Sequence, residues 1–163
     1  MGAIFTPSVY HTELIDGQEV EKPLPKDLHA FIQGFLLVRL AQQLPRKYRV
    51  LPELNVLCGS DRIIPDITVP LRSARYHDGD LADPAFLCVE ILSPGQTISN
   101  LFDKAERILG AGTPLCWVIW PERRQAWHYG KDRLAEAKEE LVVDLADGDC
   151  VRVSLAELWS ELD

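Results

Sequence analysis

Two acidic residues stand alone in otherwise apolar stretches of the sequence. Glu90 lies within Phe86-Leu-Cys-Val-Glu-Ile-Leu92, and Asp66 lies within Ile63-Ile-Pro-Asp-Ile-Thr-Val69. A run that is apolar on both sides of one acid is typical of a central strand that is covered on both faces. A carboxylate there loses its hydration, which costs several kcal/mol unless a metal ion, a lysine or protonation compensates. For Glu90 alone, a structural salt bridge is an equally good explanation.

Asp66 makes a metal site the better explanation. If strands 63–69 and 86–92 pair, the two carboxylates converge on one face of the sheet. Two acids held close together repel each other, and a divalent cation relieves that repulsion. Hard oxygen ligands with open positions for water favour Mg²⁺ or Mn²⁺. We therefore predict that Asp66 and Glu90 are the ligands of Mg²⁺ (or Mn²⁺) and that both are catalytic.

Metal-assisted hydrolysis of a phosphodiester also needs a cationic side chain to stabilise charge or to position the attacking water. The position two residues after Glu90, on the same strand face, is Leu92. The nearest alternative is Lys104, on the helix that follows. Lys104 lies beside Asp103 and Glu106, so an ordinary solvated lysine explains it equally well, and spacing alone does not decide.

The elements that would position these residues follow from hydrophobic periodicity. The spacing predicts a helix over 26–44, ended by Pro45, strands over 48–57, 63–69, 86–92 and 115–120, and a helix over 100–109 with Ser99 or Asn100 as its N-cap. The proline inside 63–69 indicates an edge strand or a bulge. The unit 86–92, 100–109, 115–120 is a strand-helix-strand crossover, which joins parallel strands. A mixed α/β sheet flanked by helices is therefore expected.

The two ends of the chain add further elements. Asp16-Gly17 supplies the turn of an N-terminal hairpin over residues 13–20. The polar segment 72–83 is predicted to be a mobile loop. Extra antiparallel strands are expected at 125–129, 141–145 and 151–153, and Ser154 with Glu157 forms a capping box for a last helix that runs to Leu162. We predict one domain over residues 1–163, with its core at about 26–130.

Composition limits the function. The net charge is -8, which argues against tight non-specific binding to nucleic acid. The cysteines form no C-x-x-C pair and mostly lie in apolar runs, which predicts reduced thiols and a cytoplasmic location. No apolar stretch is long enough for a membrane span. A phosphate backbone would have to meet a limited set of basic residues: Arg72, Arg75, Arg123, Arg124, Lys131 and Arg133.

Several short motifs occur together in a recognisable order. They are Pro65-Asp66, Val89-Glu-Ile-Leu-Ser-Pro94, Lys104, Gly112, Pro114, Trp117 and Pro121, preceded by Glu13-Leu-Ile-Asp-Gly17, His29 and Glu53. Over about residues 10–130 this order resembles the Uma-two family, which is grouped with restriction-endonuclease-like PD-(D/E)XK proteins. The resemblance implies a restriction-endonuclease-like fold, with Asp66 and Glu90 as metal ligands. It also implies that Lys104 is a catalytic lysine moved from strand to helix, and that His29 and Glu53 line the site.

The sequence departs from the family pattern at three positions. The family has an aspartate four residues before the helix lysine, where this chain has Asn100. Asn100 removes a charge that would orient Lys104 or bind metal, so it bears on catalytic competence. Ile108 and Trp120 replace a family aromatic and a family aspartate, and we interpret both as packing changes.

Three classes of function follow. The first is a Mg²⁺-dependent endonuclease whose partner is nucleic acid, DNA in the first place. The second is a weak or inactive member of the same fold that acts as an interaction or regulatory module, which the acidic balance and Asn100 favour. The third, an acid/base carboxylate pair of the glycosidase kind, lacks the aromatic sugar platforms that such enzymes carry. Four tryptophans in a small acidic domain also predict an apolar surface for a homodimer.

Overall fold

The structure, a computed structural model, describes residues 11–163. These residues form three helices: α1 (Asp27–Gln43), α2 (Ile98–Gly110) and α3 (Leu155–Ser160). A 3-10 turn covers Pro121–Arg123. The strands are β1 (Thr12–Ile15), β2 (Gln18–Glu21), β3 (Leu51–Pro52), β4 (Val56–Cys58), β5 (Asp61–Ile63), β6 (Ile67–Val69), β7 (Tyr76–His77), β8 (Asp80–Leu81), β9 (Leu87–Ile91), β10 (Leu115–Trp120), β11 (Gln125–Gly130), β12 (Arg133–Glu136), β13 (Glu140–Asp144) and β14 (Cys150–Ser154).

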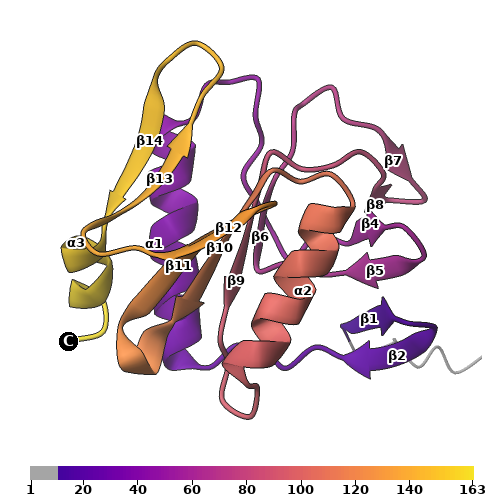
Figure 1. The fold of residues 1–163 in the computed structure, drawn as a ribbon, viewed down its shortest axis with the longest axis horizontal. Coiled ribbons are helices and arrows are strands. Elements are labelled where there is room, and N and C mark those ends of the chain that lie inside the picture. Colours follow the sequence, from indigo (N-terminus) through magenta and orange to yellow (C-terminus); the bar gives the residue numbers. More distant parts are fainter. Residues whose placement is uncertain (1–10) are drawn as a thin grey trace, which may run out of the picture.

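The central sheet has the strand order β12-β11-β10-β9-β6-β3. Only β9 and β10 are parallel, and α2 connects them as predicted, while the other neighbours are antiparallel. A second sheet, β2-β1-β5-β4-β8-β7, includes the predicted N-terminal hairpin. The predicted C-terminal antiparallel strands are also present, and β13 and β14 form a separate pair. Figure 1 shows β9 and its neighbours between α1 and α2, with the hairpin β1–β2 at one end.

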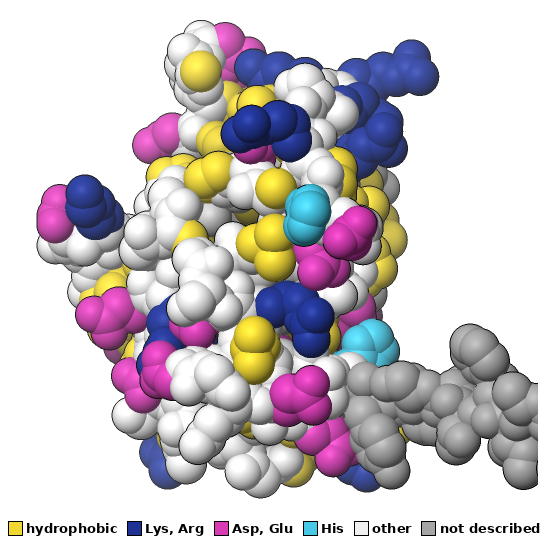
Figure 2. Space-filling model, turned by 90° about the vertical axis from the view of Figure 1, so that its right-hand side faces the viewer, with side chains coloured by type: hydrophobic (Ala, Val, Ile, Leu, Met, Phe, Trp, Pro, Cys, Tyr) yellow, Lys and Arg dark blue, Asp and Glu magenta, His cyan; other side chains and the backbone are white. Residues whose placement is uncertain are grey.

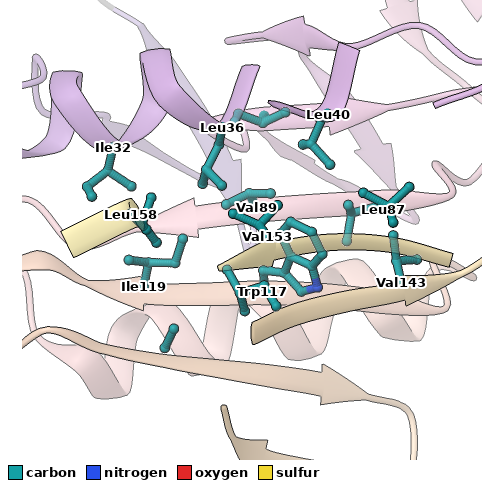
Figure 3. Close-up of a cluster of buried hydrophobic side chains, with 14 of the residues drawn as sticks. Ile32, Leu36, Leu40, Leu87, Val89, Trp117, Ile119, Val143, Val153 and Leu158 are labelled. Atoms are coloured by element: carbon teal, nitrogen blue, oxygen red, sulfur yellow. The ribbon is translucent and has the colours of Figure 1, made fainter. Parts of the chain in front are cut away.

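Two apolar clusters fix the central sheet between these layers. On one face, Leu36 of α1 packs with Val89 and Trp117 of the sheet and with β13, β14 and α3 (Figure 3). On the other face, Leu101 of α2 packs with Cys88 and with parts of the second sheet. Alternate residues of β9 therefore face opposite layers, and Glu90 faces the layer that contains α2.

Two of the predicted strands are each divided in two. The segment 48–57 forms β3 in the central sheet and β4 in the second sheet, because Glu53 takes a left-handed φ of 52° between them. The segment 63–69 forms β5 and β6, again in different sheets, with Pro65-Asp66 between them. Proline has no N–H to donate to a ladder, so the strand ends there. Pro65 is therefore neither in an edge strand nor in a bulge.

Other local predictions were also corrected. The expected mobile loop over 72–83 contains the small hairpin β7–β8, whose turn uses positive φ at Asp78 and Gly79 and whose β8 pairs with β4. β12 had not been predicted. Helix α2 begins at Ile98, and its N-cap is Thr97, whose side chain accepts a hydrogen bond from the Asn100 N–H. Helix α3 ends at Ser160, before the predicted Leu162.

The remaining local predictions hold. Helix α1 matches the predicted 26–44, and the Ser154 side chain caps α3 by accepting a hydrogen bond from the Glu157 N–H. All four cysteines are free, and three of them are buried. Among residues 11–163, no helix has both the length and the apolar character that crossing a membrane requires.

Candidate active site

Asp66 and Glu90 lie opposite each other where β6 meets β9. The pairs Ile67 with Val89 and Thr68 with Cys88 set the register, so the residue before β6 falls across from Glu90. Asp66 and Glu90 are each 1% exposed. The strand pairing that the sequence analysis assumed is therefore present, and it brings the two predicted ligands to one place.

Donors on both of its oxygens hold the Asp66 carboxylate. Oδ2 accepts a hydrogen bond of 2.6 Å from the Ile91 N–H. Oδ1 lies 2.8 Å from Nζ of Lys22 and 3.0 Å from Nε2 of His29. Neither of these two contacts to Oδ1 has regular hydrogen-bond geometry, so we treat them as a close ion pair and a close polar contact. Burial favours the protonated acid, but Lys22 and His29 outweigh it and hold the pKa of Asp66 below its ordinary range.

Glu90 is less well compensated than Asp66. Its Oε2 accepts a hydrogen bond of 3.4 Å from Nζ of Lys104, whereas its buried Oε1 has no hydrogen-bond partner among residues 11–163. Burial, only partly opposed by the Lys104 ammonium, raises the pKa of Glu90 to about 8. Glu90 therefore takes up a proton more readily than an exposed glutamate does, and a further cation beside it would favour the ionised form.

Lys104 reaches the site from α2, where the sequence analysis placed it. Its Nζ lies 2.8 Å from Oε1 of Glu13, a residue of β1, in addition to its contact with Glu90. The same Glu13 oxygen accepts a hydrogen bond of 3.0 Å from the Ile64 N–H. Burial disfavours the ammonium, but the carboxylates of Glu90 and Glu13 outweigh it, and the pKa of Lys104 lies above its ordinary value. This lysine is buried, which excludes an ordinary solvated side chain.

Glu53 and His29, two of the three predicted supporting residues, both lie at the site. His29 contacts Asp66 directly. Glu53 contacts it through Lys22, whose Nζ lies 2.8 Å from Glu53 Oε2. Gln33 of α1 donates hydrogen bonds to Glu53 Oε1 (3.1 Å) and to the Asp66 carbonyl oxygen (2.8 Å). The left-handed backbone of Glu53 is a conformation that non-glycine residues rarely adopt and that often accompanies functional sites.

Asn100, the third supporting residue, lies apart from the two metal-ligand candidates. It is exposed, one helical turn before Lys104, and lines a groove of about 220 Å³ between the hairpin and α2. Glu13, Lys104 and Arg107 also line this groove, which we call the hairpin groove. Leu92, at the position where a strand cation was expected, is only partly buried. The hairpin groove therefore gives a route from the surface to Lys104.

The charges of this site and the unpaired oxygen of Glu90 are compatible with a divalent cation. Four carboxyl groups, Glu13, Glu53, Asp66 and Glu90, surround two ammonium groups, Lys22 and Lys104. If all are ionised, four negative and two positive charges leave a formal charge of -2, which one Mg²⁺ would balance. The orphaned Glu90 Oε1 is a suitable hard ligand. No cluster of three or more His, Cys, Asp and Glu side chains within residues 11–163 forms a ready metal cage, but Mg²⁺ commonly uses one or two carboxylates and keeps its waters.

Comparison with known proteins places the chain in a family. The family model Uma2, described as "Putative restriction endonuclease", matches residues 6–160. The chain belongs to the Uma2 family. A crystal structure of "a putative nuclease belonging to DUF820" from Anabaena variabilis superimposes with a TM-score of 0.79, over 93% of this chain and 91% of that one, at 24% identity. That likeness confirms the predicted fold class. Among curated proteins, none matches the chain.

In this Uma2 chain, sequence reasoning missed Lys22 and Gln33 and assigned Glu13 no part in the chemistry. Lys22 directly follows β2 and precedes Pro23, and nothing in its local sequence distinguishes it from a surface lysine. Gln33 lies within α1, where the apolar periodicity predicts a helix but gives no sign that this polar side chain reaches the site. Only Glu13 had a signal, since it belongs to the hairpin motif that resembles the family.

Proposed function

We propose that this Uma2 protein is a Mg²⁺-dependent nuclease that hydrolyses phosphodiester bonds. The observation that carries the proposal is the buried pair Asp66 and Glu90, opposite each other on β6 and β9, with a lysine within reach of Glu90. A family described as "Putative restriction endonuclease" and a structural neighbour described as a putative nuclease support the general class.

Asp66 and Glu90 would hold the metal ion. Bound there, Mg²⁺ supplies a Lewis acid that stabilises charge on the phosphate and lowers the pKa of a bound water. The Ile91 N–H fixes the orientation of the Asp66 carboxylate through Oδ2. Glu90 contacts Lys104 through Oε2, so its Oε1, which accepts no hydrogen bond from the described part of the chain, would be available for a cation.

Lys104 would assist the chemistry from the other side of Glu90. Glu13 and Glu90 hold its ammonium in the charged form, so it can donate a hydrogen bond to a phosphate oxygen or orient the attacking water, but it cannot act as a base. The hairpin groove leads from solvent to this ammonium. Because Asn100 in that groove is neutral, it leaves Lys104 without the acidic partner on α2 that the family pattern would supply.

A nucleic-acid substrate, with DNA favoured, must approach a protein of net charge -8. Figure 2 shows acidic and basic side chains interspersed on the face that it views, with lysine and arginine side chains gathered at its upper edge. Two basic residues from the predicted set already form ion pairs: Arg75 pairs with Asp83 and Arg124 with Asp163. Arg72 lines a hollow together with Arg46 and Arg49. We expect binding to be weak and strongly dependent on salt.

A cleavage assay tests the proposal. Single- and double-stranded DNA and RNA are incubated with Mg²⁺ or Mn²⁺ and either the unmodified chain, Asp66→Ala or Asp132→Ala. Asp132 is an exposed acid in the turn between β11 and β12, so its loss controls for a simple change in charge. Cleavage by the unmodified chain and Asp132→Ala, but not by Asp66→Ala, supports the proposal. Equal inactivity of all three on every substrate contradicts it.

One observation favours the second function, an inactive member of the fold that acts as an interaction or regulatory module. Lys22 already lies against Asp66 Oδ1, the oxygen that a metal would need. Calorimetric titration with Mg²⁺ and Mn²⁺ separates the two functions. Binding that Asp66→Ala abolishes favours the nuclease, and the absence of binding favours the inactive module.

A further inference from the structure

The Lys22 ammonium occupies a pocket made of oxygens that metals also use. Its Nζ lies 2.8 Å from Asp66 Oδ1, 2.8 Å from Glu53 Oε2 and 2.6 Å from the Ile64 carbonyl oxygen. An ammonium group has three N–H donors, and these three oxygens surround them. Carboxylate and carbonyl oxygens are also the ligands of Mg²⁺ and Mn²⁺. Lys22 is 7% exposed, so this cation is sequestered inside the protein.

With Lys22 in this position, both oxygens of Asp66 already have a donor or a cation beside them. Oδ2 accepts the Ile91 N–H, and Oδ1 is shared by Lys22 and His29. A magnesium ion would bind that oxygen at about 2.0–2.1 Å, and an ammonium 2.8 Å from the same oxygen already supplies positive charge there and repels a second cation. We propose that Lys22 is a tethered cation that competes with the divalent metal for Asp66, so that the metal binds only when Lys22 withdraws. This inference rests on the metal site of the proposed function.

A pocket beside Lys22 can accommodate its ammonium group when it leaves Asp66. The pocket has a volume of about 340 Å³ and is lined by Lys22 itself, Pro23, Leu24, Gln33 and Glu53. Lys22 comes directly after β2, an edge strand whose side chains are all exposed. The flexible four-carbon stem of a lysine lets its ammonium move by side-chain rotation alone. Withdrawal into this pocket therefore does not require the central sheet to change.

Calorimetric titration of Mn²⁺ into three forms of the full chain tests the competition: the unmodified chain, Lys22→Met and Lys131→Met. Methionine keeps the length of the side chain without its charge. Lys131 is an exposed lysine between β11 and β12, at the opposite edge of the central sheet from β6 and β3. If Lys22 is withdrawn in about a tenth of the molecules or fewer, its removal tightens binding by about tenfold or more. Lys131→Met should bind like the unmodified chain. Equal affinity in all three forms overturns the proposal.

A second measurement uses the unmodified chain, in case Lys22→Met folds poorly. Reductive methylation of lysines, followed by mass spectrometry of the peptides, reports the accessibility of each amine. We expect Lys22 to be protected without metal and several-fold more reactive with saturating Mg²⁺, while Lys131 does not change. Protection of Lys22 that persists when metal is bound overturns the competition.

The outcomes distinguish the inference from the proposed function. Tighter Mn²⁺ binding by Lys22→Met without any cleavage of nucleic acid supports the competition and contradicts the nuclease. Cleavage by the unmodified chain, with equal metal affinity in Lys22→Met, supports the nuclease and contradicts the competition. If none of the three forms binds metal, both are overturned.

Discussion

Replacing Lys104 with methionine tests whether the buried charges at this site depend on one another. The Lys104 ammonium lies 2.8 Å from Glu13 Oε1 and 3.4 Å from Glu90 Oε2, and all three side chains are less than a tenth exposed. Methionine preserves most of the apolar stem and removes the charge. The substitution therefore leaves two buried acids without their shared cation.

The expected loss follows from how each acid can respond. Removing one partner of a buried ion pair costs about 3–5 kcal/mol. Glu90 limits the loss, because burial has already raised its pKa to about 8 and the uptake of a proton removes its charge. Glu13, which lies closer to the lysine at 2.8 Å, carries most of the cost. We therefore expect the lower end, about 3 kcal/mol, which corresponds to a fall in Tm of about 6–12 °C for a chain of this size.

Urea unfolding at pH 7 measures this loss, with Lys138→Met as the matched control. The Lys138 side chain is 75% exposed, so its loss should change stability by about 0.5 kcal/mol at most. The double variant Glu13→Gln with Lys104→Met should recover part of the loss, with a coupling of about 0.5–3 kcal/mol. A loss below about 1 kcal/mol for Lys104→Met, or strict additivity in the double variant, would refute the claim that Glu13 depends on this lysine.

Three further predictions concern the core, the hairpin and assembly. Leu36→Ala empties a fully buried position of α1 and should cost about 2–5 kcal/mol in urea unfolding; a smaller loss would contradict tight packing there. Arg107 holds Asp16 of the hairpin at 2.8 Å, so Arg107→Met should speed amide hydrogen exchange in the hairpin. Arg107 lowers the pKa of Asp16 from its ordinary 3.8, so the difference from the unmodified chain should be full above pH 3.8 and vanish as the pH falls below it. The homodimer remains a prediction: exposed Phe31 and Val38 on α1 suit it, and light scattering should give about twice the 18.4 kDa chain mass, whereas the mass of one chain would contradict it.

The elements with strong periodicity could be predicted from the sequence. Helix α1, the crossover from β9 through α2 to β10, and the cap of α3 by Ser154 all have local signals that tertiary packing reinforces. Helix and strand boundaries with weaker sequence signals were predicted less accurately. Thr97 caps α2 in place of the predicted Ser99 or Asn100. Threonine, serine and asparagine are all preferred at N-caps, so residue type alone does not choose among the three positions. β12 is almost entirely exposed, so its sequence has no apolar residue at every second position.

The site was predictable only in part, for a physical reason. A buried acid such as Glu90 can be recognised in the sequence because its neighbours on the strand are apolar. A buried lysine such as Lys22 does not, because its own strand, β2, is exposed and polar. Its burial comes from Asp66, Glu53 and the Ile64 carbonyl oxygen, and that last contact spans 42 residues of the chain. Long-range contacts of this kind leave no local pattern.

The two places where strand prediction was wrong are also the places that build the cation pocket. An uninterrupted strand over 63–69 would have used the Ile64 carbonyl oxygen in its ladder, and that oxygen would not be free to accept from Lys22. Because Pro65 ends the strand, this oxygen turns to Lys22, and the Asp66 side chain caps the Ile91 N–H. The left-handed turn at Glu53 likewise ends β3 and brings a second carboxylate to the same ammonium. Local sequence preference and fold disagree at both breaks, as they often do at functional sites, and both breaks supply oxygens to one cation.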